Sequence, residues 1–148
     1  MAPDGSALYV LDATVDSGKG ALVKVEGANT TQLVTDLRVS YGNGIAVDNV
    51  HNVIATDGTV SGDLAKKYPL DNKYGGGRDS ILIFDRLADG DSMPMRVIRG
   101  DKAGIFGIRQ MAVWPKGGWI VVSQITDGGI SEPDGTFVGV WSIYDNGN

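Results

Sequence analysis

Oxygen-bearing side chains that suit a hard cation stand where apolar runs of the sequence begin or end. Asn43 precedes the run GIAV, Asp57 follows VIAT, and Asp127 follows VVSQIT. Ca²⁺ takes about six to eight oxygen ligands, which carboxylate and amide groups on converging loops can supply. The sequence therefore makes Asn43, Asp57 and Asp127 candidate ligands of Ca²⁺ or another divalent cation, provided that the fold brings them together.

These side chains also have an ordinary structural explanation. Asn and Asp at strand ends commonly hydrogen-bond to nearby backbone or start a turn. The acidic segment 131–136, SEPDGT, contains a common Pro-Asp-Gly turn. On the sequence alone, the metal interpretation and the structural one both stay open.

A segment rich in tyrosine and basic residues is the second place where chemistry could occur. Residues 58–78 carry Tyr68, Tyr74 and Arg78 among several lysines, on a chain whose net charge is −5. Aromatic and arginine side chains are enriched where proteins contact partners. A loop of about twenty residues is typical of a lid, a binding loop or a solvated segment. We expect residues 60–78 to be the most mobile part of the chain.

The candidate ligand-binding residues are thus strand-end oxygen side chains together with aromatic and basic side chains of this loop. They are Asn43, Asp57, Tyr68, Tyr74 and Arg78. We assign no catalytic residue, because His51 is the only histidine and the chain has no cysteine. A lone histidine gives no support for a catalytic triad or a histidine-rich metal site. Whether the protein is an enzyme stays open.

Composition limits the class of protein and of partner. The chain has 148 residues, of which 42% are hydrophobic and 21% charged, as expected for one globular domain with a core. Its net charge of −5 argues against a nucleic-acid partner, whose phosphates would be repelled. No apolar run approaches the length of about 18 residues that spans a membrane, so no membrane partner is expected.

Short apolar runs rich in valine and isoleucine, bounded by Gly, Asp, Asn and Pro, predict an all-β protein. The 22 glycines suit tight turns between short strands. The best helix candidate, Ser61–Tyr68, is short and glycine-flanked. The expected strands are Ala7–Leu11, Ala21–Val25, Gln32–Thr35, Gly44–Asp48, Val53–Thr56, Ser80–Asp85, Met95–Arg99, Gln110–Trp114, Trp119–Ser123 and Val138–Tyr144.

An internal repeat relates these strands. The stretch 43–57, NGIAVDNVHNVIATD, aligns with 109–123, RQMAVWPKGGWIVVS, and 3–12, PDGSALYVLD, matches the second half of both. The alignment places Asp12, Asp57 and Ser123 at one position. A four-stranded unit that recurs at about 40 to 50 residues is typical of a β-propeller blade. A β-sandwich with coincidentally similar strands is the competing fold.

The strand count predicts an incomplete propeller. Residues 3–36 would form a first blade without its inner strand, 43–100 a complete second blade, and 108–148 a third blade without its outer strand. Closed propellers have about four to eight blades. We therefore expect the missing blades to come from the same longer chain, of which this would be a fragment, or from self-association of the chain.

The quoted repeat resembles the six-bladed NHL-repeat propellers. The stretch 81–106, ILIFDRLADGDSMPMRVIRGDKAGIF, is similar to a segment of the gluconolactonase-like branch of that superfamily. The sequence departs from the usual repeat at Val50–His51, where a glycine turn is common, and at Trp114, where Asp is common. The superfamily includes metal-dependent lactonases, lyases and plain binding scaffolds.

The resemblance implies where function would lie. In such propellers the inner strands line a channel, and the longer loops emerge on one face, which would carry Asn43, Asp57 and segment 58–78. The lactonase branch has a metal ligand at an Asn before Gly, similar to Asn43–Gly44. The resemblance also favours a periplasmic or secreted location.

The leading function is an NHL-like propeller segment that binds a small molecule or a protein through its loop-bearing face. The alternative is a part of a divalent-metal-dependent, lactonase-like hydrolase. A third possibility is a purely structural repeat of a larger extracytoplasmic protein.

Overall fold

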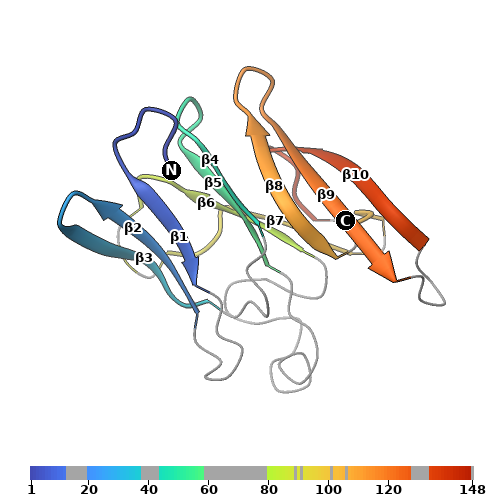
Figure 1. The fold of residues 1–148 in the computed structure, drawn as a ribbon, viewed down its shortest axis with the longest axis horizontal. Coiled ribbons are helices and arrows are strands. Elements are labelled where there is room, and N and C mark those ends of the chain that lie inside the picture. The colour runs from blue at the N-terminus through green and yellow to red at the C-terminus, as the bar shows by residue number, and fades with distance from the viewer. Residues whose placement is uncertain are drawn as a thin grey trace.

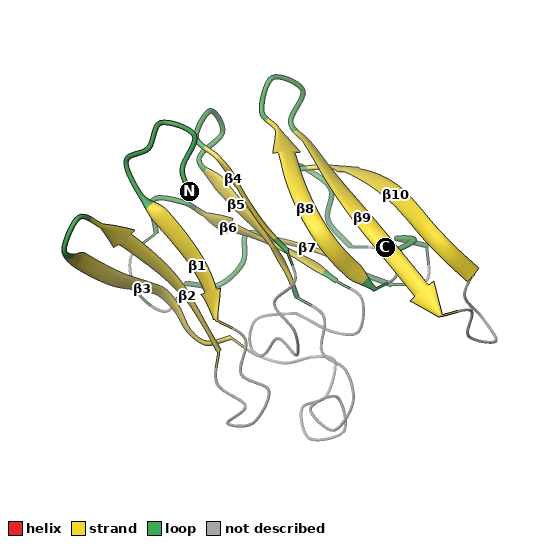
Figure 2. Cartoon of the chain, viewed as in Figure 1, coloured by secondary structure: helices red, strands yellow, loops and turns green. Residues whose placement is uncertain are grey.

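The computed structural model describes residues 1–12, 20–37, 44–58, 80–88, 90, 92–100, 102–105, 107–127 and 134–147. Over these residues the chain forms ten strands and no helix (Figure 1, Figure 2). The all-β prediction is therefore confirmed, while the helix candidate Ser61–Tyr68 lies outside the described residues. None of the described segments forms a helix with the length and apolarity that a membrane span requires.

The strands form three antiparallel sheets in chain order. The first sheet contains β1 (Leu8–Asp12), β2 (Gly20–Glu26) and β3 (Asn29–Leu37). The second contains β4 (Ile45–Asp48), β5 (Val53–Asp57), β6 (Ile81–Asp85) and β7 (Arg96–Ile98). The third contains β8 (Ile108–Trp114), β9 (Trp119–Asp127) and β10 (Asp134–Ser142).

Every expected strand overlaps an observed one, and the differences lie at the ends. β3 starts at Asn29 rather than Gln32, because Thr30 and Thr31 pair with β2, and threonine suits a half-buried strand. β7 is shorter than expected and includes only Arg96–Ile98. Polar residues inside a strand give no apolar signal, so such boundaries are the hardest part to predict.

The second sheet is buried on both faces. Ile54 of β5 and Phe84 of β6 belong to the hydrophobic cluster shared with the first sheet. Their neighbours Val53, Ala55 and Ile83 belong to the cluster shared with the third sheet. Successive side chains point to opposite faces of a strand, so a strand covered on both sides is apolar throughout. The position of the second sheet between the other two therefore explains why VIA in β5 and ILIF in β6 are continuous apolar runs.

The first sheet departs from the repeat alignment. That alignment equates Tyr9 with Ile54, so both should face the same way around a ring of blades. Instead, Tyr9 and Ile54 belong to one cluster between the first two sheets, and Leu8 and Val10 face outward. A shift of one residue, or of any odd number, exchanges the two faces of a strand, so the packing disagrees with the alignment of the first unit. The alignment of Ile54 with Ile120 agrees with the packing, since Ile120 faces the second sheet.

The segment after β10 returns to the edge of the second sheet. Gly147 forms a parallel bridge with Ile98 of β7, and its N–H donates to the Val97 carbonyl at 2.7 Å. Oδ1 of Asn146 accepts from the Val97 N–H at 3.0 Å. These bonds occupy polar groups along the outer edge of the sheet, which would otherwise be available to another strand.

Candidate functional site

The innermost strands of the second and third sheets, β4 and β8, lie side by side (Figure 1). Gly44, which directly precedes β4, allows this approach. A Cβ atom added there would lie 3.1 Å from Cβ of Met111 and 3.2 Å from Cγ2 of Ile108. A larger side chain at this position would therefore push the two strands apart.

An open hollow of about 460 Å³ lies where these strands meet. Among the described residues its lining is mainly apolar, with one amide and one hydroxyl side chain. The lining residues are Ile45 of β4, Gln110, Met111 and Ala112 of β8, and Val121 and Ser123 of β9. Gln110 pairs with Ser123 in the sheet register, so the two polar side chains lie together on one face of the third sheet.

Asp57 ends β5 beside the start of β4. Its N–H donates to the Gly44 carbonyl at 2.8 Å, and the next N–H, of Gly58, donates to the Ser80 carbonyl at 2.8 Å. Asp57 is only 2% exposed. A carboxylate that is buried at a strand end needs partners to offset the loss of water, and Asp57 does interact with other groups. Asp57 is thus a buried carboxylate at a strand end that backbone hydrogen bonds join to Gly44 and Ser80.

We call this end of the sheets the loop-bearing end, defined by Asp12, Leu37, Asp57 and Asp127, where described strands stop. In the sequence, the longer segments that join strands, 13–19, 38–43, 59–79 and 128–133, follow or almost directly follow these residues. Ile45 and Gln110 lie near the loop-bearing ends of β4 and β8. The hollow therefore lies near the loop-bearing end.

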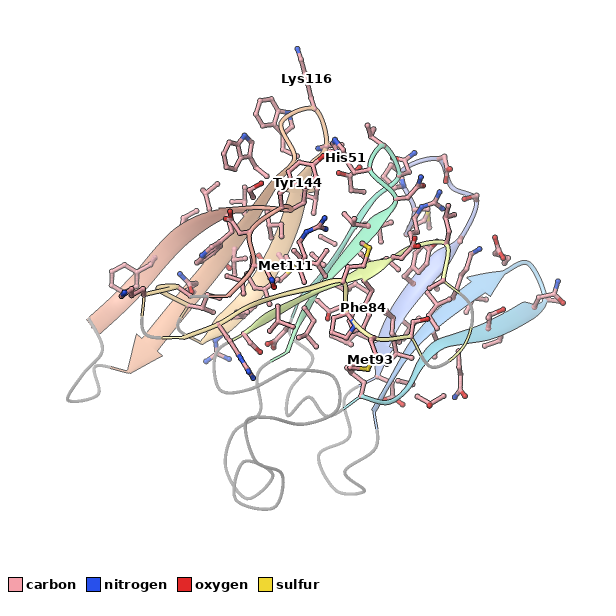
Figure 3. All side chains as sticks on the ribbon, turned by 180° about the vertical axis from the view of Figure 1, so that it is seen from behind. His51, Phe84, Met93, Met111, Lys116 and Tyr144 are labelled. Carbon is pink, nitrogen blue, oxygen red and sulfur yellow. The ribbon has the colours of Figure 1, made fainter. Side chains whose placement is uncertain are left out.

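The opposite end, the short-turn end, is defined by the turns 3–6, 49–52 and 115–118. There Oδ1 of Asp48 accepts from the N–H groups of Val50 at 2.8 Å and His51 at 3.1 Å. Nδ1 of His51 lies 2.7 Å from Oδ2 of Asp48, where Nδ1–H can donate. The edge of the His51 ring meets Tyr144 at 6.1 Å between centroids, and Arg96 lies 5.5 Å from the centre of the Tyr144 ring (Figure 3). The group links the second and third sheets.

The three-sheet arrangement is similar to a solved propeller. No family model matches the sequence, and no curated protein matches it. The crystal structure of the WD40 beta propeller domain of Doa1 matches with a TM-score of 0.50 and 11% sequence identity. The match covers 92% of this chain and 38% of that chain.

The chain has a β-propeller fold. Its three antiparallel sheets are blades of an incomplete propeller, so the fold prediction is confirmed over the β-sandwich alternative. At 38% of the matched chain, the three blades span well under half of that protein. The likeness supports the propeller fold and does not distinguish NHL repeats from other propeller repeats.

The structure describes only some of the candidate residues that the sequence suggested. Asp57 lies at the loop-bearing end, as does the backbone of Asp127, which pairs with Asp134. The other candidates lie outside the described residues, and so do the side chains of Asp127 and Asp134. Residues 60–78, which we expected to be mobile, also lie outside the described residues. Those candidates are Asn43, Tyr68, Tyr74 and Arg78. Across the described part of the chain, no three His, Asp or Glu side chains lie close enough to hold a metal ion.

Sequence reasoning missed the hollow and the Asp48–His51–Tyr144 group. Side chains in the middle of strands line the hollow, and the sequence pattern there indicates only alternation. For the second group a signal was present, because Asp three residues before His in DNVH allows the carboxylate to bond back to the turn. The partner Tyr144 comes from the next blade, which no local pattern identifies.

Proposed function

We propose that this chain is an NHL-like β-propeller segment that binds a small molecule or a protein at its loop-bearing end. The observation that carries the proposal is the hollow between β4, β8 and β9. Binding sites on repeat folds commonly use loops at one end of a rigid scaffold. The NHL assignment itself is supported by the repeat phrases at 43–57 and 81–106.

The chemistry of the hollow favours binding rather than catalysis. Six described residues line the hollow; none of these six is charged, and four of them are apolar. Gln110 offers an amide donor and acceptor, and Ser123 a hydroxyl. Such a lining suits a ligand part with an apolar body and an uncharged polar group. Proton transfer would require a titratable side chain, and none of these six described residues carries one.

The test is fragment screening of the ¹⁵N-labelled chain by NMR, with a library of small uncharged molecules. We expect hits to shift the backbone resonances of Gln110, Ala112 and Ser123. Gln110→Leu and Ser123→Val should weaken such hits at least about tenfold, because each removes a hydrogen-bonding group from a desolvated contact. Gln32→Leu is the matched control, since Gln32 is exposed on the first sheet.

Two results would count against the proposal. One is a set of hits whose shifts map only to the short-turn end, around His51 and Lys116. The other is an equal response of Gln32→Leu and Gln110→Leu, which would show that the loss comes from general surface changes.

The second candidate, part of a divalent-metal-dependent lactonase-like hydrolase, is favoured by one observation. Asp57 is a buried carboxylate at the loop-bearing end, and its backbone N–H bonds to Gly44, the residue that follows Asn43. The described residues do not by themselves make a metal centre, so we derive no step through a metal. Calorimetric titration with Ca²⁺, Mg²⁺ and Zn²⁺ tests this candidate. Binding that Asp57→Asn abolishes would support it, and absence of heat for all three ions would reject it.

A further inference from the structure

The ring of Tyr144 lies where the second and third blades meet at the short-turn end. Tyr144 is 62% exposed, although it contacts both blades. The edge of the His51 ring meets it, and the guanidinium of Arg96 lies 5.5 Å from its centre. A Cβ added at Gly118 would lie 3.7 Å from Cε2 of Tyr144, so the ring also lies against the turn 115–118. Contacts from both blades therefore hold the ring, while most of its surface stays open.

Three side chains around this ring carry a positive charge or gain one on protonation. They are Arg96 at the start of β7, His51, and Lys116 in the turn 115–118. Figure 3 shows Lys116, His51 and Tyr144 at the same end of the molecule. Within the part of the chain that the structure describes, neither Arg96 nor Lys116 forms an ion pair or a side-chain hydrogen bond.

Carboxylates at the same end are engaged within their own turns. Four of them accept a backbone N–H from a residue two or three positions away: Asp4, Asp48, Asp85 and Asp145. Each such carboxylate is directed toward the backbone beside it rather than toward a neighbouring cation. The positive side chains beside Tyr144 therefore keep their charge available to a ligand.

We propose that the surface around Tyr144 binds an acidic peptide segment of a partner protein. We call it the tyrosine surface, and its residues are His51, Arg96, Lys116, Gly118 and Tyr144. Carboxylates of the peptide pair with Arg96 and Lys116, and an apolar side chain of the peptide covers Tyr144. This site lies at the opposite end of the sheets from the hollow, so it is a second interaction site beyond the function proposed above.

The combination of charge and aromatic surface favours a peptide as the occupant. Arginine pairs with carboxylates through two parallel N–H bonds, and arginine and tyrosine are enriched where protein interfaces are strongest. A small anion would use the charges and leave the ring of Tyr144 uncovered. An extended peptide can supply carboxylates and apolar side chains together, because its successive side chains point to opposite sides.

The charge of the whole chain argues against a long polyanion in this place. The net charge is −5, which repels a phosphate backbone. A short acidic segment carries only a few charges and meets the positive side chains locally. Salt screens exposed charges beyond about 10 Å at about 0.1 M, so the rest of the acidic chain has little effect on such a segment.

The backbone that carries Tyr144 is fixed on both sides of the ring. The N–H of Ile143 donates to the Gly118 carbonyl at 2.9 Å. Three residues later, Oδ1 of Asn146 accepts from the Val97 N–H at 3.0 Å. A surface that is already ordered loses less conformational freedom when a partner binds. The tyrosine surface is thus organised before binding.

The experiment titrates the ¹⁵N-labelled chain, at fixed pH, with a blocked hexapeptide of alternating glutamate and leucine. Because His51 is the only histidine, its ring signals in NMR spectra report on this site alone. We expect these signals and the amide of Gly118 to shift, with a Kd below about 1 mM at about 50 mM salt. The same peptide with glutamine in place of glutamate should bind at least about tenfold more weakly, because it lacks the charge.

Variants of the chain locate the contact. Arg96→Gln should weaken binding of the glutamate peptide at least about tenfold, because it removes a charge-assisted contact. Lys116→Gln should weaken it about threefold, because an exposed ion pair contributes less. Arg109→Gln is the matched control: it removes the same charge from an exposed position at the loop-bearing end of β8 and should leave binding unchanged. Circular dichroism checks that each variant keeps its strand content.

Several outcomes would overturn the proposal. Unshifted signals of His51 and Gly118 up to about 5 mM peptide would mean that no acidic peptide binds there. Equal binding of the two peptides, or an equal loss in Arg96→Gln and Arg109→Gln, would show that these charges are not used. Inorganic phosphate or a hexathymidylate that binds as tightly as the peptide would assign the surface to phosphate groups instead. The variants leave the six described residues of the hollow unchanged, so failure here and failure of fragment binding are separate results.

Discussion

Nδ1 of His51 lies 2.7 Å from Oδ2 of Asp48, a side chain with no exposed surface. The carboxylate also accepts the N–H groups of Val50 and His51. It therefore organises the turn between the two inner strands of the second blade and fixes the ring that meets Tyr144 of the third blade.

Asp48→Ala should lower the free energy of unfolding by about 2 kcal/mol, because it removes a buried, charged acceptor that three partly buried donors share. Urea unfolding at fixed protein concentration measures the change. Asp85→Ala is the matched control: Oδ1 of Asp85 accepts one exposed N–H, from Leu87, at 2.9 Å. Its loss should stay below about 1 kcal/mol. Equal losses for both variants would show that the Asp48 contacts do not stabilise the blade.

Gly20→Ala should be far more damaging than Gly44→Ala. A Cβ at Gly20 would collide with the backbone oxygens of Asp12 and Leu37, which cannot move without disrupting the first sheet. At Gly44 the nearest atoms, Cβ of Met111 at 3.1 Å and Cγ2 of Ile108 at 3.2 Å, would have to move by only a few tenths of an ångström, through a small separation of β4 and β8. We expect losses in the free energy of unfolding of about 3 and about 1 kcal/mol, respectively, from overpacking. Thermal unfolding ranks the two variants, and the reverse order would contradict the packing at Gly20.

Phe84→Ala should cost about 3 to 5 kcal/mol of unfolding free energy, the range for a large side chain lost from a core. Phe84 is 1% exposed in the cluster between the first and second blades (Figure 3). Leu87→Ala, three residues later and mostly exposed, should change stability by less than about 0.5 kcal/mol. Denaturant midpoints compare the two, and a small effect of Phe84→Ala would mean that the blades do not pack through this cluster.

Asp4 provides a prediction about pH. The hydroxyl and the N–H of Ser6 donate to its carboxylate at 2.7 and 3.0 Å, and these bonds lower the pKa of Asp4. Because the folded pKa is lowered, the stabilisation is present above the unfolded pKa and is lost as pH falls through the folded pKa. Ser6→Ala should raise the pKa of Asp4 toward its ordinary value. Carboxyl ¹³C shifts followed by NMR measure it, and an unchanged pKa would contradict the role of Ser6.

The sequence was sufficient to predict the strands and their grouping, because apolar runs bounded by Gly, Asp and Asn are explicit in the chain. The repeat alignment failed at the first blade, where the two faces of β1 are exchanged relative to it. Tyr9 and Ile54 are each the second residue of similar strands, LYVLD and VIATD, and only their shared cluster shows that both face the space between the first two sheets. A pattern with a period of two cannot detect a slip of one when both faces are apolar, as they are for LYVLD.

The candidate site was less predictable for a related reason. Asp57 was found because strand ends are visible in the sequence. Gln110 and Ser123 line the hollow together with Ile45 of the neighbouring blade, and the place of Ile45 beside them depends on the contact between β4 and β8. Local sequence patterns report which residues share a face of a strand, and not which sheet lies opposite that face.

The side chain of Thr56 places a hydroxyl group in a buried, apolar environment. The residue has no exposed surface, and among the described residues its Oγ1 has no hydrogen-bond partner. It shares a face of β5 with Ile54, toward the first blade. An unpaired hydroxyl in such surroundings costs about 1 to 3 kcal/mol.

Thr56→Val replaces the hydroxyl with a methyl of similar shape and keeps a β-branched residue in the strand. We therefore expect the free energy of unfolding to rise by about 1 kcal/mol. Thr56→Ser is the opposite control: it keeps the hydroxyl and removes the methyl, and should lower stability by about 1 kcal/mol. Urea unfolding of both variants at one protein concentration decides the matter. A loss of stability in Thr56→Val would show that the hydroxyl has a partner, such as a buried water, because only a satisfied group loses a hydrogen bond on replacement.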